Sequence, residues 1–146
     1  MKRSLFLFIL CFLVFSSLCL YAQEYDNQAL RYLKSGLLNL MNGNYKKAIE
    51  ECNKVIRIDP DSAVTYVLRA RAYFELGDID RAIADSTQAI KRDKENIGAY
   101  LIRGNAYGKK GDLERAIADW NAILKINPDF DDAKLNIEKA GLQRGF

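Results

Sequence analysis

The stretch of sequence that decides the fold is GDLERAIADW, residues 111–120. A nearly identical stretch, GDIDRAIADS, occupies residues 77–86, and a looser copy, GNYKKAIEEC, occupies residues 43–52. Each copy begins thirty-four residues after the one before it. A fixed period of this length is typical of an architecture built from stacked repeats, in which one unit cannot bury its apolar face alone.

The period divides most of the chain into three blocks of equal length, residues 29–62, 63–96 and 97–130, which align without a gap. The same kinds of residue recur at the same places in each block. These sets are Tyr32, Tyr66 and Tyr100; Gly36, Ala70 and Gly104; Gly43, Gly77 and Gly111; and Ala48, Ala82 and Ala116. The chain is therefore expected to be a tandem array rather than a domain with a closed core.

Each block carries two apolar stripes with helical spacing. In the second block Tyr66, Ala70 and Tyr73 fall at i, i+4 and i+7, and a second stripe runs through residues 82–90. This spacing places the apolar side chains of each stripe on one face of a helix. Each block is therefore expected to be a pair of helices.

The residues between the stripes are those that end one helix and begin the next. Gly77 is free to take the left-handed conformation that closes a helix, and Asp78 follows as an N-cap for the second helix. Asn44 and Asp112 are expected to cap in the same way. Asp59-Pro60 and Asn127-Pro128 separate successive blocks, with Lys94 at the proline position of the middle block.

The two ends of the array differ. Ala72 and Ala106 provide small contacts for the preceding block, but the equivalent Leu38 has no block before it. We expect Leu38 to be covered by the N-terminal extension, residues 23–28, or by a partner. At the other end, residues 131–143 continue the register as a capping helix, apolar toward the third block and polar on the opposite side.

Residues 29–130, with the cap to about 143, resemble the tetratricopeptide repeat family. The resemblance rests on the period and on the recurring Tyr, Ala or Gly, Tyr, Gly and Ala positions described above. Asn39, Ile123 and Lys94 depart from the family pattern. The resemblance implies an all-α fold: three tandem helical hairpins and a capping helix in a right-handed solenoid.

The N-terminus has the layout of an export signal. A short basic start is followed by an apolar run from Leu5 to Leu20 and then by Tyr21-Ala22. Sixteen helical residues span about 24 Å, which is short of the ~30 Å needed to cross a bilayer. We expect residues 1–22 to be a signal-peptide helix cleaved after Ala22, which predicts a periplasmic or secreted protein. An uncleaved membrane anchor is the alternative.

The composition argues against several kinds of chemistry. The chain has no histidine, so it lacks the usual partner of a catalytic serine or cysteine and the commonest zinc ligand. Cys52 is the one cysteine after residue 22 and is expected to be a core residue, with a reactive thiol as the alternative. Asp129, Asp131 and Asp132 are expected to favour a helix N-terminus rather than to bind a metal. We therefore expect a protein that is not an enzyme and binds no cofactor or metal.

The charge balance does not indicate a nucleic-acid partner. The 22 basic residues nearly match the 19 acidic ones, and Lys2 and Arg3 belong to the expected signal. The basic groups near Lys91 and Lys109 are interleaved with acidic residues. A membrane is expected as a partner only if the N-terminal segment stays uncleaved.

The resemblance implies that the first helices of the blocks line a concave groove for a peptide or a partner helix. The residues that the register places in this groove are Leu33, Leu37, Leu40, Met41, Val67, Arg71, Phe74, Glu75, Leu101, Asn105 and Lys109. Chaperone-binding members of the family clamp a terminal carboxylate with lysines and asparagines, but Leu33, Leu37 and Leu68 stand at such positions here.

An apolar strip with Arg71 and Asn105 near its middle predicts a different ligand, an amphipathic helix or extended segment with one acidic or amide group. The function expected is that of a scaffold or adaptor in a cell-envelope assembly. The alternatives are a groove half filled by the chain's own N-terminal segment, and a structural subunit that self-associates through the Leu38 end into a homo-oligomer.

Overall fold

The computed structural model describes residue 24 and residues 27–144, so the expected export segment lies outside the described residues. The described part is all α, with no strand. A first helix covers residues 27–41. The helices that follow are α2 (Tyr45–Ile58), α3 (Ala63–Glu75), α4 (Ile79–Arg92), α5 (Ile97–Lys109), α6 (Leu113–Ile126) and α7 (Asp131–Arg144).

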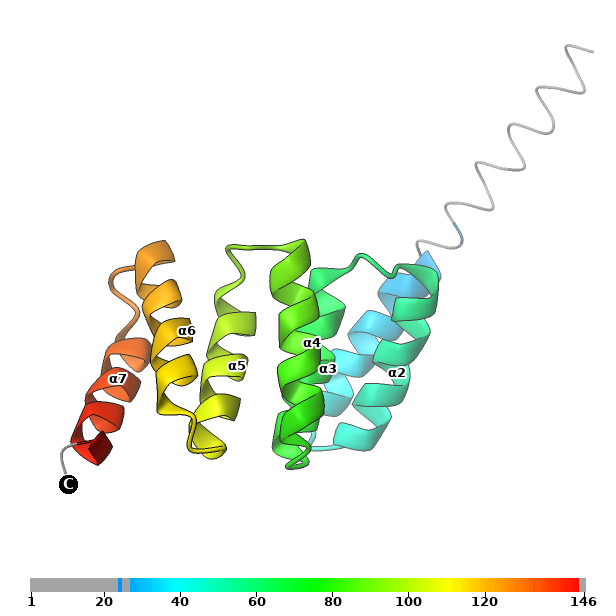
Figure 1. Cartoon of the computed structure of the whole chain (residues 1–146). Helices are drawn as coiled ribbons and strands as arrows, with labels where there is room; N and C mark the ends of the chain where they lie inside the picture. The colour runs from blue at the N-terminus through cyan, green and yellow to red at the C-terminus, as the bar shows by residue number, and fades with distance from the viewer. Residues whose placement is uncertain (1–23, 25–26, 145–146) are drawn as a thin grey trace, which may run out of the picture.

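The helices form three hairpins side by side, and α7 closes the row (Figure 1). From α2 onward, each helix contacts the next one along the chain, and α3 also contacts α5. No comparable contact joins α4 to α6 among these helices. The first helices of the hairpins therefore lie on the inside of the curve and the second helices on the outside. The expected all-α solenoid of helical hairpins is confirmed.

The turn inside each hairpin follows the expected chemistry at its glycine. Gly43, Gly77 and Gly111 have φ of 74°, 80° and 77°, the left-handed region that only glycine adopts without strain. The amide of Asp78 then reaches back to the carbonyl of Tyr73 at 2.9 Å, which satisfies a free carbonyl at the end of α3.

The expected N-caps are confirmed in two hairpins and wrong in the first. Asp78 accepts a hydrogen bond from the backbone amide of Arg81, and Asp112 accepts one from Arg115. Asn44 makes no side-chain cap bond. The two carboxylates also form ion pairs with the side chains of those same arginines, which fixes their position, whereas Asn44 is neutral and has no such second contact.

The turn between hairpins depends on the residue before the proline position. Asp59, Asp93 and Asn127 each accept a hydrogen bond from the backbone amide two residues later, at 3.1 Å in all three cases. This side-chain turn closes the connection by itself. Lys94 can therefore replace proline in the middle block without changing the turn.

Packing between hairpins depends on small side chains. Ala72 and Ala106 are fully buried where each first helix meets the preceding hairpin, as predicted. Tyr66 is also buried, and Tyr100 packs against a cluster around Trp120. In α7, Ala133 and Ala140 belong to that same cluster, so the capping helix packs through the predicted face.

Two arginines tie neighbouring hairpins together in a pattern that repeats with the sequence period. Arg69 donates to both carboxylate oxygens of Asp85 at 2.7 Å and to Asn53 of the preceding hairpin at 2.6 Å. Arg103 repeats this arrangement thirty-four residues later, with Asp119 and Thr87 as its partners.

These hydrogen bonds raise the pKa of both arginines. Removing one partner from a buried ion pair costs about 3–5 kcal/mol because the other charge is left uncompensated. The ion pair thus joins the two helices of one hairpin, and the bond to Asn53 or Thr87 links that hairpin to the preceding one. In the first block Ser35 and Glu51 occupy the equivalent positions, so the first hairpin has no such arginine of its own and is joined to the second through Arg69 and Asn53.

The facing positions within a hairpin are matched in size. Gly36 faces Cys52 in the first hairpin, and Gly104 faces Trp120 in the third. A Cβ added at Gly104 would lie 2.7 Å from Nε1 of Trp120, whereas one at Gly36 would lie 3.5 Å from its nearest neighbour, an ordinary contact.

This difference predicts opposite effects for the same substitution. Gly104→Ala is expected to destabilise the protein by about 1–3 kcal/mol, because the buried indole cannot give way. Gly36→Ala is expected to leave stability unchanged or raise it by up to ~1 kcal/mol, because alanine favours a helix over glycine. Urea unfolding followed by circular dichroism measures both. Equal midpoints for the two variants would contradict the packing described here.

Cys52 is a core residue, as predicted. Its side chain is 1% exposed, and burial raises the pKa of its thiol to about 11. A nucleophilic cysteine requires an accessible thiolate with a lowered pKa. The environment of Cys52 has the opposite effect.

We therefore expect an aromatic disulfide reagent at pH 8 to react with Cys52 only as fast as the protein opens. Adding urea above the unfolding midpoint should make the reaction immediate. The absorbance of the released thiolate gives both rates, and Cys52→Ala provides the blank. Fast labelling of the folded protein would revive the reactive-thiol alternative.

Candidate functional site

The groove residues expected from the register all lie on the helices that line the inside of the curve. Their exposure differs, however. Leu37, Arg71, Glu75, Lys109 and Met41 are exposed, whereas Leu33, Leu40, Val67, Phe74, Leu101 and Asn105 are half-buried. The exposed members can meet a ligand directly, and the half-buried ones form the floor between neighbouring helices.

One pocket lies at this face, between the first and second hairpins. It encloses about 260 Å³ and is lined by Leu40, Met41, Tyr45, Arg71 and Glu75. Three helices supply these residues: the first helix, α2 and α3. Four of the five were expected in the groove. Tyr45 was not, because it lies at the start of a second helix, and only the hairpin turn brings it beside Leu40 and Met41.

Arg71 and Glu75 form the polar edge of this pocket. Nε of Arg71 donates to Oε1 of Glu75 at 2.6 Å, and the two residues are one helical turn apart. The Arg71 side chain remains 53% exposed. An exposed pair of this kind contributes only ~0.3–0.5 kcal/mol, so a ligand can rearrange it at little cost.

Two other expected residues contact each other rather than stand free. Nζ of Lys109 lies 4.1 Å from the centre of the Phe74 ring, within the range of a cation–π interaction. Phe74 also packs against the buried cluster of Ala70, Ala82 and Ile102. Phe74 is therefore part of the floor between α3 and α5, and Lys109 covers it.

The side-chain oxygen of Asn105, a residue expected in the groove, is used within the fold. It accepts hydrogen bonds from Nε1 of Trp120 at 3.1 Å and from Nδ2 of Asn136 at 3.2 Å. Asn105 thus joins α5 to α6 and α7. The sequence offers one signal for this, since a buried tryptophan needs a hydrogen-bond acceptor for its N–H.

The inside of the curve also carries most of the large apolar side chains that stay exposed. Those that share register with the expected groove or lie one turn from it are Leu30, Leu37, Met41, Val64, Leu135 and Leu142. Leu38 and Leu76 lie elsewhere. Exposed apolar residues gathered on one face commonly mark an interaction site.

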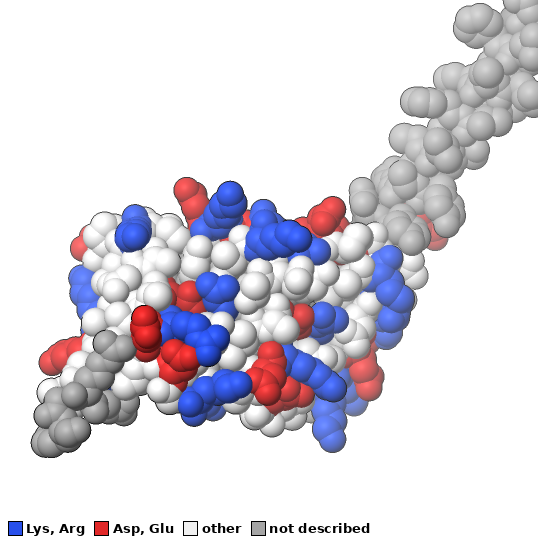
Figure 2. Space-filling model, in the orientation of Figure 1, with Lys and Arg blue, Asp and Glu red and all other residues white. Residues whose placement is uncertain are grey.

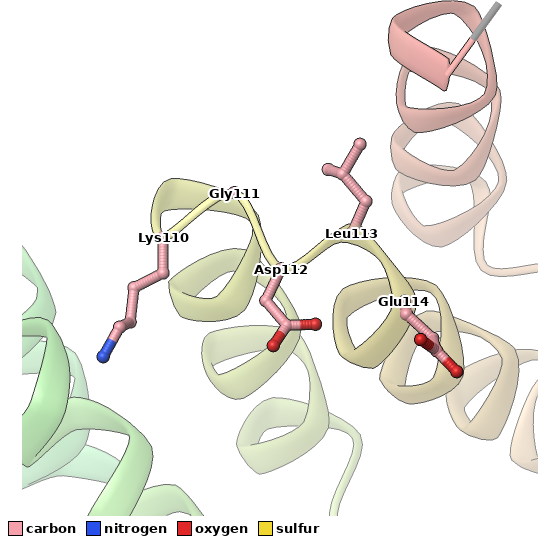
Figure 3. Close-up of a pocket in the computed structure, with 5 residues that line it drawn as sticks. All are labelled: Lys110, Gly111, Asp112, Leu113 and Glu114. Atoms are coloured by element: carbon pink, nitrogen blue, oxygen red, sulfur yellow. The ribbon is translucent and has the colours of Figure 1, made fainter.

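A second depression, of about 540 Å³, lies at the turn between α5 and α6. Residues 110–114 alone line it. In Figure 3 the Lys110 side chain extends toward α4, Leu113 toward α7 and Glu114 away from both. Lys110 pairs with Asp80 at 2.6 Å. Because the side chains diverge, this depression offers no convergent set of groups for a ligand.

At the N-terminal end of the row, the exposed surface of the first helix differs from the surfaces through which the hairpins pack. Leu38 is 59% exposed, and the described residues of the N-terminal extension do not cover it. Arg31 and Lys34 lie on the same face of the first helix, and both are exposed. At the position of Arg31, α3 has Thr65 and α5 has Ala99, and at the position of Lys34 both helices have apolar residues. These large charged side chains prevent another hairpin from approaching as closely as α3 approaches α2.

The remaining surface shows no other distinctive site. Figure 2 shows basic and acidic side chains interspersed over the visible face, without a continuous area of one sign. Within residues 24 and 27–144, no group of three or more acidic or cysteine side chains is placed to hold a metal ion. Asp131 and Asp132 lie in the first turn of α7. None of the described helices has the length and apolar character to span a bilayer.

Comparisons with known proteins agree with this geometry. Two sequence profiles of the tetratricopeptide repeat match residues 39–84 and 67–134. A search of curated protein sequences gives no significant match.

Similar solved structures are tetratricopeptide repeat domains. The Arabidopsis OM64 domain is 26% identical with a TM-score of 0.80, and the match covers 82% of this chain and 98% of that one. The first domain of Spaghetti (RPAP3), bound to the HSP90 peptide SRMEEVD, is 28% identical with a TM-score of 0.80 over 82% and 95%.

The second domain of Spaghetti, bound to the same peptide, is 31% identical with a TM-score of 0.69, and the match covers 73% of this chain and 99% of that one. Its identity and near-complete coverage agree with the two profile matches and with the stacked hairpins. The chain belongs to the tetratricopeptide repeat family.

Proposed function

We propose that this protein is a non-catalytic interaction module that holds a peptide segment or a partner helix of another protein against the inside of its curve. The observation that carries this proposal is the pocket formed by Leu40, Met41, Tyr45, Arg71 and Glu75, where three helices converge. The exposed apolar residues on the same face extend the surface available to a partner.

The ligand differs from that of the similar domains that hold HSP90 or HSP70 peptides. Those peptides end in EEVD. By resemblance, the positions at which chaperone-binding members of the family clamp a terminal carboxylate carry Leu33, Leu37 and Leu68 in this chain. Aliphatic side chains cannot replace the charge and hydrogen bonds that a terminal carboxylate loses on leaving water. The partner is therefore a mostly apolar segment rather than an acidic C-terminus.

The test is capture of partner proteins from an extract of the native cells. Met41→Asp with Arg71→Glu places acidic groups at the pocket without touching the core, because Met41 is 76% exposed and Arg71 is exposed as well. We expect this double variant to lose the partners that the unchanged protein captures, while the circular dichroism spectrum stays the same.

Leu76→Asp with Arg57→Glu is the matched control, since these exposed residues lie outside the predicted groove. It should retain the same partners. Equal capture by all three proteins, measured by quantitative mass spectrometry, would place the binding site elsewhere.

The module acts outside the cytoplasm, in the periplasm or after secretion, as a scaffold or adaptor in an envelope assembly. The apolar run from Leu5 to Leu20 behind a basic start supports this location. Its near-neutral charge beyond that segment fits recognition through apolar contacts rather than through electrostatic steering.

Export predicts that the protein isolated from its own cells begins at Gln23. Intact-mass spectrometry measures this directly, and the precursor made without export machinery supplies the reference mass. A full-length chain in the membrane fraction would show the uncleaved anchor instead. A full-length chain in the cytoplasmic fraction would contradict export.

Self-association through the Leu38 end is the less favoured alternative. Arg31 and Lys34 share a face of the first helix with Leu38, and a second copy would have to bury both charges.

A further inference from the structure

Arg71 makes fewer hydrogen bonds than the half-buried arginines among the described residues. Arg69, Arg92 and Arg103 each use all three of their nitrogen atoms in hydrogen bonds to the protein. Arg71 uses only Nε, which donates to Glu75. Within the described residues, its Nη1 and Nη2 have no hydrogen-bond partner. They form an open fork at the edge of the pocket.

From this arrangement we propose that the pocket recognises an internal partner segment in which an apolar side chain lies one helical turn or less from an aspartate or glutamate. The apolar side chain enters between Leu40, Met41 and Tyr45, and the side-chain carboxylate accepts two hydrogen bonds from Nη1 and Nη2 of Arg71. This inference rests on the function proposed above, and it specifies the ligand of that same site.

The chemistry of the pocket favours a carboxylate over other polar groups. A guanidinium fork matches a carboxylate in shape, and two parallel charge-assisted hydrogen bonds are stronger than bonds between neutral groups. Glu75 accepts from Nε of Arg71 at 2.6 Å, which leaves Nη1 and Nη2 for a ligand.

A side-chain carboxylate is favoured over a free C-terminus because Arg71 is the one cation among the five residues that line the pocket. Lys109, the other basic residue expected in the groove, lies over the Phe74 ring and is committed to that contact. The next position along the row from Arg71 is Asn105, which carries no charge. A chain terminus would therefore find no second cation beside Arg71 in this row.

The test uses fluorescein-labelled, helix-forming peptides of twelve residues, blocked at both ends, with leucines at positions 2, 5 and 9. Three versions carry glutamate, glutamine or lysine at position 6. A fourth carries glutamine there and has a free C-terminal carboxylate. Fluorescence polarisation measures their affinity for the full chain lacking residues 1–22, the form that export predicts.

We expect the glutamate peptide to bind about tenfold more tightly than the glutamine peptide and the lysine peptide to bind most weakly. Arg71→Gln should abolish the preference for glutamate and leave the affinity for the glutamine peptide unchanged. Arg71→Lys should restore only part of the preference, because an ammonium group lacks the fork. Arg115→Gln, which alters an exposed arginine of α6, should change nothing.

Other outcomes would overturn the inference in distinguishable ways. Equal affinity for the glutamate and glutamine peptides, with Met41→Asp weakening both, would leave the site in place and refute the role of Arg71. Tighter binding of the peptide with the free C-terminus than of the glutamate peptide would show that Arg71 binds a terminal carboxylate instead of a side-chain carboxylate. If no peptide binds while the pocket variant still loses its native partners, the ligand class is wrong and the proposed function stands.

Discussion

The whole structure depends on one constraint: a single helical hairpin of this length cannot bury its own apolar side. Each hairpin must therefore lie against the next, and the contact is close only where the side chains are small. Ala72 and Ala106 meet this requirement, and both are fully buried. The hairpins thus stack in a row rather than fold around a common centre, and stability comes from nearest-neighbour contacts.

Small residues allow close approach, but they do not fix the angle between hairpins. That role falls to directional contacts. Arg69 and Arg103 each bind a carboxylate of their own hairpin and a polar side chain of the preceding one. At the end of the row, Asn105 accepts from both Trp120 and Asn136, so the capping helix is joined to the third hairpin. A partly buried polar group that lacks a hydrogen-bond partner destabilises the fold. These contacts therefore favour the one arrangement of helices in which every such group has its partner.

The candidate site follows from the same geometry. The first helices of the hairpins lie next to each other on the inside of the curve. Their side chains that do not pack against the second helices form one surface there. Phe74 and Leu101 become its floor, while Met41 and Arg71 remain exposed. The pocket at this surface combines an apolar base with an arginine whose terminal nitrogens have no partner among the described residues.

Much of the fold could be predicted from the sequence, because the period and the turn residues are local signals. The thirty-four-residue repeat set the number of hairpins, and glycine at 43, 77 and 111 set the place of each turn, since only glycine adopts that backbone angle easily. The buried state of Cys52 also followed from its register.

Only the tertiary structure decided what each groove residue does, because that depends on contacts between helices far apart in the chain. It bound Asn105 to Trp120, placed Lys109 over Phe74 and brought Tyr45 beside Leu40. It also separated the roles of Arg69 and Arg71, which lie two residues apart in one helix. The repeat register shows which face of its helix a residue occupies. How many of its hydrogen-bond donors stay free depends on the side chains of the neighbouring helices.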